Sequence, residues 1–264
     1  MFFENISPDK IQRLLASLPI KTVIGEFSGR DSVAAIIKAF EDNSIRHILP
    51  VASFAGTEYG DPGTLTENHT KLMERIKTLY GNDKKLYPLI FYSNPDLWSV
   101  INGRFTSLII ERFGFYTPCI GCHAYFHILR VPMALQLGKK IISGERESHD
   151  QKIKVNQLPL CLSFYKGILA EFEVELLFPL RGIQNGNEIE NLIGWDWQEG
   201  KNHPECSYSG NYRNLEGKAV YEEEKINRFL EEFLGPVLKK VTQLYIDNQE
   251  IPRAELIKEV ENIL

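Results

Sequence analysis

Alternation between short apolar segments and segments with helical spacing constrains this sequence most. Residues 21–27 have the pattern of a buried strand and lead through a Ser-Gly turn into a helical pattern at 33–40. Further strand patterns, each with an apolar centre, lie at 46–52, 86–91, 139–143 and 170–180, and helical patterns at 65–80 and 121–137. Strands that are joined through helices lie parallel in one sheet. The sequence therefore predicts an α/β fold with a parallel twisted sheet and helices on both faces.

The chain divides into three expected regions. Residues 1–20 predict a leading helix, residues 21–185 the domain that contains the parallel sheet, and residues 186–264 a C-terminal extension with a loop and a helix. That long amphipathic helix spans 219–245, and Gly235-Pro236 is expected to bend it. Its apolar stripe is interpreted as core or as the interface of a possible homodimer.

Composition narrows the class of protein. The chain has 264 residues, 43% of them hydrophobic, which is enough for a packed core, and its formal charge of −5 argues against a generally basic surface. Residues 1–8 carry no basic and apolar leader, and no apolar run is long enough to span a membrane. We expect a cytoplasmic protein that does not contact membranes.

The turn after the first apolar segment reads Ser28-Gly29-Arg30-Asp31-Ser32. A strand that turns directly into a helix presents free backbone amides, which favour a bound anion. The turn resembles the SGGxDS signature of the PP-loop ATP pyrophosphatase superfamily (adenine nucleotide alpha hydrolase-like fold), with one glycine fewer. The resemblance implies that Ser28, Gly29 and Ser32 hold phosphate oxygens of ATP, that Asp31 organises the loop or Mg²⁺, and that Arg30 supplies additional charge. A strand-to-helix turn capped by Ser28 or Asp31 is the alternative.

Two other strand ends extend this resemblance. The second strand ends near Ser53, where PP-loop enzymes receive adenine. Gly144 and Glu145 follow the fourth strand and resemble the segment that closes the nucleotide pocket in tRNA thiolases, with Glu145 in place of a histidine. With His149 and Asp150, Glu145 forms a polar cluster that is a candidate for acid or base chemistry.

Four cysteines are too few for a disulfide scaffold in a chain of this length. Cys119 and Cys122 have the spacing of a metal or redox half-site at the start of a helix, which favours their thiolate forms, whereas Cys161 lies in an apolar stretch and predicts a core position. His123 and His127 lie close to the pair and would complete a Cys2His2 zinc site as an alternative.

Three later segments resemble the C-terminal half of the iron-sulfur-dependent two-thiouridine and two-thiocytidine tRNA thiolases. They are residues 178–181, an acidic helical stretch at 188–192, and a loop that contains Cys206. The resemblance implies that Cys119, Cys122 and Cys206 ligate a four-iron four-sulfur cluster whose remaining iron is open to sulfide or substrate.

The implied activity is that of an ATP-dependent sulfurtransferase that forms AMP and pyrophosphate. It would adenylate a carbonyl or amide oxygen, of a tRNA base or of a small molecule, and then sulfurate the activated carbon from sulfide or a persulfide carrier. Asp31, Cys119 and Cys122 are the predicted catalytic residues. A persulfide on Cys119 or Cys122 that Cys206 resolves is an alternative to the cluster. A non-enzymatic nucleotide- or metal-binding module is another.

Overall fold

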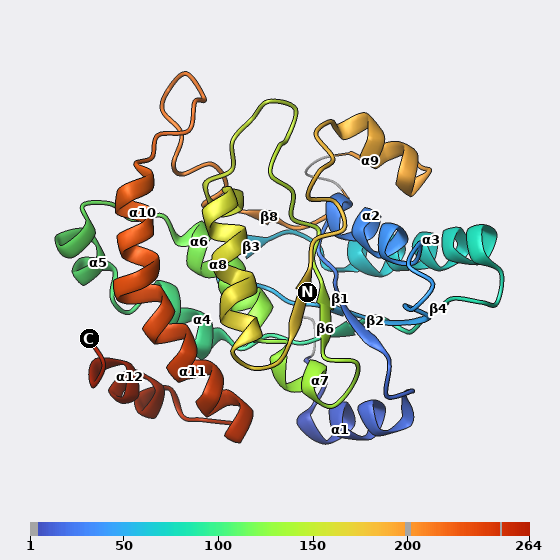
Figure 1. The fold of residues 1–264 in the computed structure, drawn as a ribbon, viewed down its shortest axis with the longest axis horizontal. Helices are drawn as coiled ribbons and strands as arrows, with labels where there is room; N and C mark the ends of the chain where they lie inside the picture. Colours follow the sequence, from blue (N-terminus) through green and yellow to red (C-terminus); the bar gives the residue numbers. More distant parts are fainter. Residues whose placement is uncertain (1–4, 199–201, 249) are drawn as a thin grey trace.

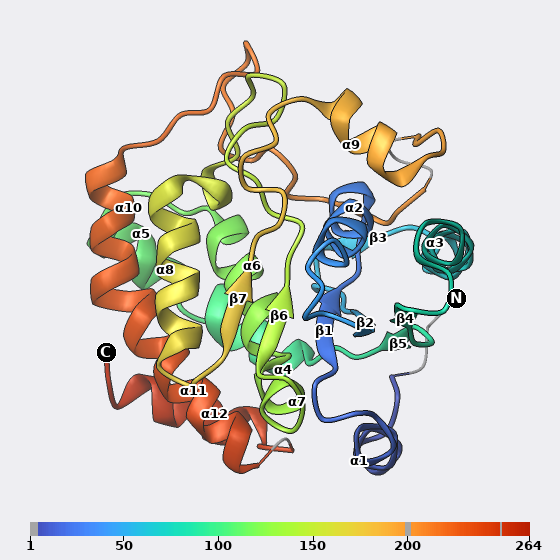
Figure 2. The same cartoon turned by 45° about the vertical axis from the view of Figure 1, so that its right-hand side comes forward.

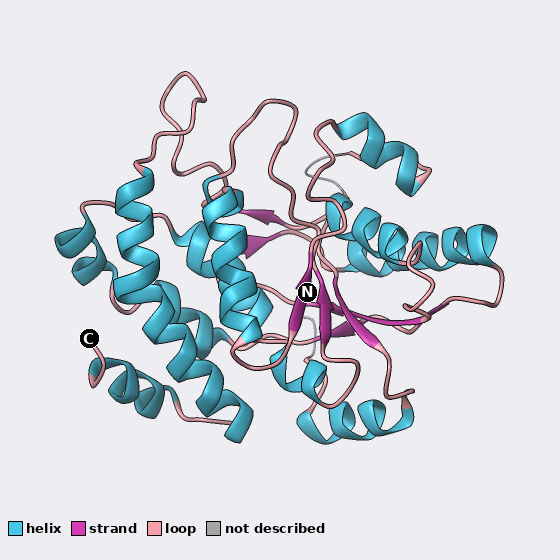
Figure 3. Cartoon of the chain, in the orientation of Figure 1, coloured by secondary structure: helices cyan, strands magenta, loops and turns pink. Residues whose placement is uncertain are grey.

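The computed structural model describes residues 5–198, 202–248 and 250–264, and it contains a parallel sheet (Figures 1 and 3). Its strands are β1 (Val23–Glu26), β2 (His47–Ala52), β4 (Lys85–Leu86), β5 (Ile90–Phe91), β6 (Lys140–Ile142) and β7 (Glu175–Leu177). They lie in the order β4-β2-β1-β6-β7, with β5 also paired to β2, and every pairing within this sheet is parallel. The predicted α/β class with a parallel sheet is confirmed.

The strand order reverses beside β1. From β1 the chain moves outward to β2, β4 and β5, and it then returns to the other side of β1 to form β6 and β7. Ile24 of β1 pairs with Leu49 on one side and with Ile141 on the other. Connections diverge at such a reversal and leave a crevice outside the carboxyl ends of the strands. The loops after β1 and β6 therefore border one crevice.

Helices cover both faces of the sheet (Figure 2). The helices are α1 (Pro8–Ser17), α2 (Arg30–Ala39), α3 (Gly63–Tyr80), α4 (Pro95–Asn102), α5 (Thr106–Phe113), α6 (Pro118–Ile128), α7 (Val131–Leu135), α8 (Pro159–Ala170), α9 (Gly186–Ile193), α10 (Glu223–Phe229), α11 (Gly235–Asp247) and α12 (Arg253–Glu261). Val23 and Ile48 face a core with α2, α3 and α9, whereas Ile24 and Leu49 face a larger core with the other helices. This alternation within β1 and β2 is the period of two that a strand buried on both faces requires.

Several predicted elements differ in extent from those observed. The weak helix expected at 103–113 is preceded by a separate helix, α4, the bent helix at 121–137 is two helices, α6 and α7, and the strand expected at 86–91 is two short strands, β4 and β5. The strand expected at 170–180 is wrong in extent, because only Glu175–Leu177 is extended. Before this strand α8 ends at Ala170 and residues 171–173 form a turn in which Glu173 has a positive φ of 58°, and after it residues 179–180 form another turn.

The long C-terminal helix is continuous but not uniform. Between α10 and α11 the backbone forms a π-helical segment, Leu230–Leu234, directly before Gly235-Pro236. Proline has no N–H to donate to the preceding turn, and widening that turn accommodates the missing hydrogen bond. The apolar stripe of this helix is buried within the chain, where Phe229 and Phe233 pack against Phe113.

A second, small sheet joins two distant parts of the chain. Strand β3 (Glu58–Tyr59) pairs antiparallel with β8 (Glu205–Cys206), and Cys206 lies opposite Glu58. Figure 1 shows this pair above the carboxyl ends of β1 and β6. Across the described residues, no helix is both long and apolar enough to cross a membrane.

The aromatic contacts of the larger core give a test of its packing. Phe233 is 0% exposed and contacts the rings of Phe105, Phe113 and Phe229. We expect Phe233→Ala to lower the free energy of unfolding by about 3–5 kcal/mol, because the cavity cannot close fully. Leu215→Ala, at a fully exposed position, is the control and should change it by less than about 0.5 kcal/mol. Urea denaturation measures both, and equal effects would contradict this description of the core.

Candidate nucleotide and cysteine site

A cavity of about 310 Å³ opens at the carboxyl ends of β1 and β6. All of the residues that the sequence assigned to the nucleotide line this cavity. They are Ser28, Gly29, Arg30, Asp31, Ser32, Ser53, Gly144 and Glu145. The structure therefore brings together three segments that are far apart in the sequence, at the crevice that the strand order creates.

The turn after β1 is closed by Ser32. Its Oγ accepts hydrogen bonds from the backbone N–H groups of Ser28 (2.9 Å) and Gly29 (3.1 Å), and it donates to the Gly29 carbonyl (2.7 Å). The capping group is thus Ser32, not Ser28 or Asp31. A β-carbon at Gly144 would lie 2.5 Å from the Ser32 nitrogen, so only glycine allows the exit of β6 to lie this close to the start of α2.

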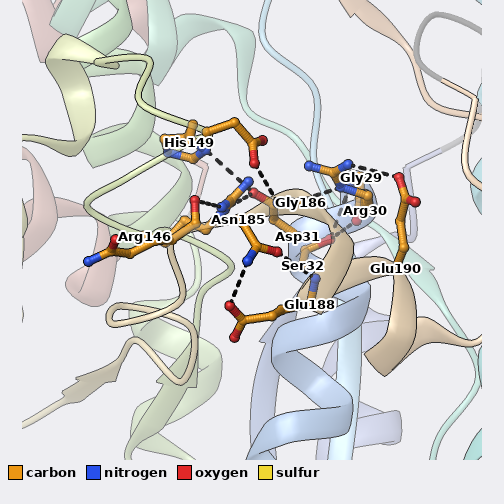
Figure 4. A network of polar contacts seen from close by, with 12 residues as sticks. Gly29, Arg30, Asp31, Ser32, Arg146, His149, Asn185, Gly186, Glu188 and Glu190 are labelled. Carbon is orange, nitrogen blue, oxygen red and sulfur yellow. Dashed lines mark hydrogen bonds and ion pairs between the residues drawn. The ribbon is translucent and has the colours of Figure 1, made fainter.

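Asp31 lies in a network of ion pairs (Figure 4). Its carboxylate is 3.1 Å from Arg30 Nε and 3.0 Å from the buried Arg146 Nε. Burial by itself would raise the pKa of Asp31, but Lys154, Arg146 and Arg30 outweigh it and hold the pKa below the usual range. Arg30 also lies 3.4 Å from Glu190 of α9. Asp31 therefore fixes the loop through arginines in this structure.

A buried group of charged side chains lies beneath the cavity. His127 of α6 places Nδ1 2.7 Å from Glu26 Oε1 and Nε2 3.3 Å from Glu145 Oε2. Arg130 is 3.7 Å from Glu26, and His123 Nδ1 is 2.5 Å from Glu145 Oε1. These contacts join β1, α6 and the segment after β6.

The carboxylates determine the charge of His127. Burial disfavours the imidazolium, but Glu26 and Glu145 outweigh that effect and raise the pKa of His127 to about 10. Burial would likewise raise the pKa of Glu145, yet His127 and His123 lower it to about 2. At neutral pH the group therefore contains a cationic His127 between two carboxylates, and neither ring nitrogen faces a cysteine.

Ser53 and Arg130, in the wall of the cavity, each have a buried polar side-chain atom that lacks a hydrogen-bond partner among the described residues. Ser53 Oγ and Arg130 Nε are both inaccessible to solvent, and the side chains are 4% and 2% exposed. A buried polar atom without a partner costs about 1–3 kcal/mol. Ser53 and Arg130 are therefore suited to a ligand that brings polar atoms into the cavity.

A second cavity, of about 190 Å³, is lined by Cys119, Cys122 and Cys206. Each thiol has a polar neighbour. Trp98 Nε1 donates to Cys122 Sγ at 3.3 Å, Thr57 Oγ1 lies 3.4 Å from Cys206 Sγ, and Cys119 Sγ lies 3.6 Å from Asn211 Oδ1. Cys161 is 0% exposed and donates to the Val155 carbonyl, so its predicted core position is confirmed.

The protonation state of the thiols differs from the expectation. Burial raises the pKa of Cys119 to about 11 and that of Cys122 well above its usual value. Desolvation outweighs the helix N-terminus, so both groups are thiols unless a metal binds. Within the described residues, no three His, Cys, Asp or Glu side chains are arranged to hold a single metal ion.

The two cavities share a wall. Its residues are Glu58, His123, Phe126, Lys154, Gln157, Cys206 and Ser209. Glu58 is half-buried, accepts a 2.6 Å hydrogen bond from the Ala55 N–H, and lies opposite Cys206 in the small sheet. Burial raises the pKa of Glu58 to about 7. A carboxyl group that can exchange a proton near neutral pH thus lies between the cavities.

Several residues of the site were not predicted from the sequence. Glu26 could have been, because a charged residue inside an otherwise apolar strand indicates a buried polar contact. Glu58 and Arg130 gave no such signal, since β3 is two residues long and Arg130 lies between two mostly apolar helices, α6 and α7. His149 and Asp150 lie beside the Ser28–Ser32 turn, where His149 contacts Gln157 and Asp150 accepts a hydrogen bond from the Gly186 N–H.

The buried charges predict how stability depends on pH. The raised pKa of His127 contributes stability that is present below pH 6.5 and lost as the pH rises to about 10. The lowered pKa of Glu145 contributes stability that is present above pH 4.5 and lost as the pH falls to about 2. Urea unfolding of the wild type across this range should show both losses. In Glu145→Gln, His127 keeps only Glu26 as an anionic partner, so the free energy of unfolding should fall less than in the wild type as the pH rises above 6.5. An equal fall in the two proteins would contradict the charges assigned to these side chains. His47→Gln, at the amino end of β2, is the control.

Comparison with known proteins gives one relationship. No known protein-family model matches the chain. The chain is 47% identical over 213 residues to the uncharacterized protein MJ0009 of Methanocaldococcus jannaschii, and the match covers 81% of this chain and 76% of the archaeal protein. This chain belongs to the same protein family as MJ0009.

Proposed function

We propose that this protein is an ATP-dependent sulfurtransferase of the PP-loop class. The observation that carries the proposal is the wall shared by the cavity at the Ser28–Ser32 turn and the cavity of the three cysteines. An acceptor at this wall would reach a nucleotide on one side and a sulfur site on the other. Holding both reactants beside one acceptor is the main contribution an enzyme can make to a two-step substitution.

The first cavity suits ATP with Mg²⁺. Its phosphate end is the start of α2, where backbone amides and the helix dipole favour an anion. The cavity also contains Ser53 and Arg130, which each have a buried polar side-chain atom without a hydrogen-bond partner among the described residues, and adenine or ribose atoms would bind there. The strand order puts the loops after β1 and β6 at the reversal, where open α/β sheets bind their ligands.

The second cavity suits an iron-sulfur cluster better than a single ion. A tetrahedral zinc ion with Zn–S bonds of about 2.3 Å needs thiolates roughly 3.8 Å apart, and no such group lies among the described side chains. A cluster carries its own sulfides and fits thiolates that surround a cavity. His127 faces Glu26 and Glu145, which disfavours the Cys2His2 zinc alternative. Cys119, Cys122 and Cys206 would hold the cluster, which when bound supplies an iron that can hold a sulfur nucleophile.

The proposed reaction balances in two steps. The acceptor carbonyl oxygen attacks the α-phosphorus of ATP, the bond to the β-phosphate breaks, pyrophosphate leaves, and the neighbouring N–H proton is released. A hydrosulfide ion then attacks the carbon of the adenylated C–O bond, that bond breaks to release AMP, and the S–H proton moves to the neighbouring nitrogen. In the persulfide alternative the terminal sulfur of the persulfide attacks this carbon and AMP leaves. The Cys206 thiolate then breaks the remaining S–S bond, which leaves a disulfide that an external thiol must reduce. Glu58, in the wall common to both cavities, would receive the N–H proton.

The acceptor we propose is a base of a tRNA. Four aromatic side chains line the cysteine cavity, namely Trp98, Phe126, Tyr208 and Tyr212. Aromatic rings bind planar heterocycles by stacking, at about 1–3 kcal/mol per base. Tyr208 is 42% exposed at the edge of this cavity, where an incoming base would meet it first.

The nucleotide half of the proposal is tested at Gly29. Its φ of −148° is open to any residue, but a valine side chain would fill the space between the loop and His203. We expect Gly29→Val to fold and to bind ATP at least about tenfold more weakly by calorimetry, a loss of about 1.4 kcal/mol. Gly182→Val, where an added β-carbon meets nothing within 4 Å, is the matched control.

Release of pyrophosphate from ATP in the presence of bulk tRNA distinguishes an enzyme from a binding module. An enzyme should release pyrophosphate, whereas a binding module should bind ATP without releasing it.

The cysteine half is tested by anaerobic purification with iron and sulfide analysis. Wild type and Cys161→Ala should carry the cluster absorption, since Cys161 lies in the core away from the cavity. Cys119→Ala, Cys122→Ala and Cys206→Ala should each lose it. A colourless, iron-free protein that contains zinc would contradict this part of the proposal. A protein free of both metals with a persulfide on Cys119 or Cys122 would favour the alternative in which Cys206 resolves that persulfide.

A further inference from the structure

We infer that His203 contacts the phosphates of the bound nucleotide and that, through the segment 203–206, nucleotide binding controls the exposure of Cys206. The inference rests on the proposed ATP site. His203 lies beside the phosphate loop, and a β-carbon at Gly29 would be 3.6 Å from its ring. Both residues line the same cavity.

The imidazole of His203 lies next to the space that a phosphate bound to this turn would occupy. The amides of Ser28 and Gly29 are occupied by Ser32 Oγ, so a phosphate that takes these amides displaces the hydroxyl and enters the space next to His203. An imidazole N–H is a donor that suits a phosphate oxygen. The ring is also packed at 5.9 Å from the Trp197 ring, which limits the positions it can take.

The same short segment carries a cysteine of the second cavity. Asn202, just before His203, accepts a hydrogen bond from the buried Asn68 of α3. At the other end, Cys206 pairs with Glu58 in the small sheet and lies in the wall common to both cavities. Only Pro204 and Glu205 separate His203 from Cys206, so a contact that shifts or fixes His203 also acts on Cys206.

The coupling is reciprocal. If a bound nucleotide lowers the affinity of Cys206 for a ligand such as a metal ion, then that ligand lowers the affinity of the protein for nucleotide by the same factor. In the proposed reaction this would make the sulfur site respond to whether ATP is bound. The order of the two steps would then depend on contacts within the chain as well as on the chemistry of the acceptor.

The test uses the full-length, cluster-free protein with Mg-ATP and with inorganic pyrophosphate as probes. The rate of alkylation of Cys206 by iodoacetamide is followed by mass spectrometry, and the buried Cys161 is the internal reference. In the wild type, saturating ATP should slow alkylation of Cys206 at least fivefold. His203→Ala should bind ATP about tenfold more weakly, and at saturating ATP its Cys206 should react at the ligand-free rate.

A second variant and a control keep the result interpretable. His203→Gln retains an N–H donor and should recover part of the ATP affinity and of the protection, whereas His47→Ala, at the amino end of β2, should behave as the wild type. If the wild type binds ATP without protection of Cys206, or if His203→Ala is protected equally, the coupling is wrong and the nucleotide site stands. If the wild type binds neither probe, the proposed nucleotide site itself is wrong.

Discussion

The contact on which the site depends is the buried imidazolium of His127 between Glu26 and Glu145. It joins the end of β1, the last turn of α6 and the segment after β6 through buried side chains. Removing one member of such a group leaves an uncompensated buried charge, which costs about 3–5 kcal/mol. The relative position of the two loops that border the larger cavity is therefore fixed by charge as well as by the sheet.

Steric fit adds a second restraint at the same place. Gly144 allows the chain that leaves β6 to lie against the first turn of α2, and Ser32 of that turn closes the loop through the backbone of Ser28 and Gly29. Asp31 and Arg146 then tie the two segments by an ion pair. The loop is consequently held from both of its sides, so a ligand finds its amides already oriented and needs only to replace one hydroxyl.

Most of the sheet and part of the site could be predicted from the sequence. Strands that are followed by turns can be recognised because their pattern is local, and Gly144 and Cys206 could be singled out because each lies in a short motif. The boundaries of β7 were misread because Phe172 and Leu180 are apolar and pack on the two cores although they lie in turns on either side of the strand. Glu58 could not be found, since its importance comes from pairing with a residue far along the chain. Interactions between distant segments leave no local pattern.

The pairing of β3 with β8 also has a consequence for the order in which the protein can mature. A ribosome delivers the strands of the large sheet and the Cys119–Cys122 pair well before Cys206, and α10, α11 and α12, which complete the larger core, emerge last. Before β8 has paired with β3, the cysteine cavity lacks the side that Cys206 contributes. A nascent chain therefore exposes Cys119 and Cys122 without Cys206. Loading of the proposed cluster, which needs all three thiols, would follow synthesis and folding of this part of the chain.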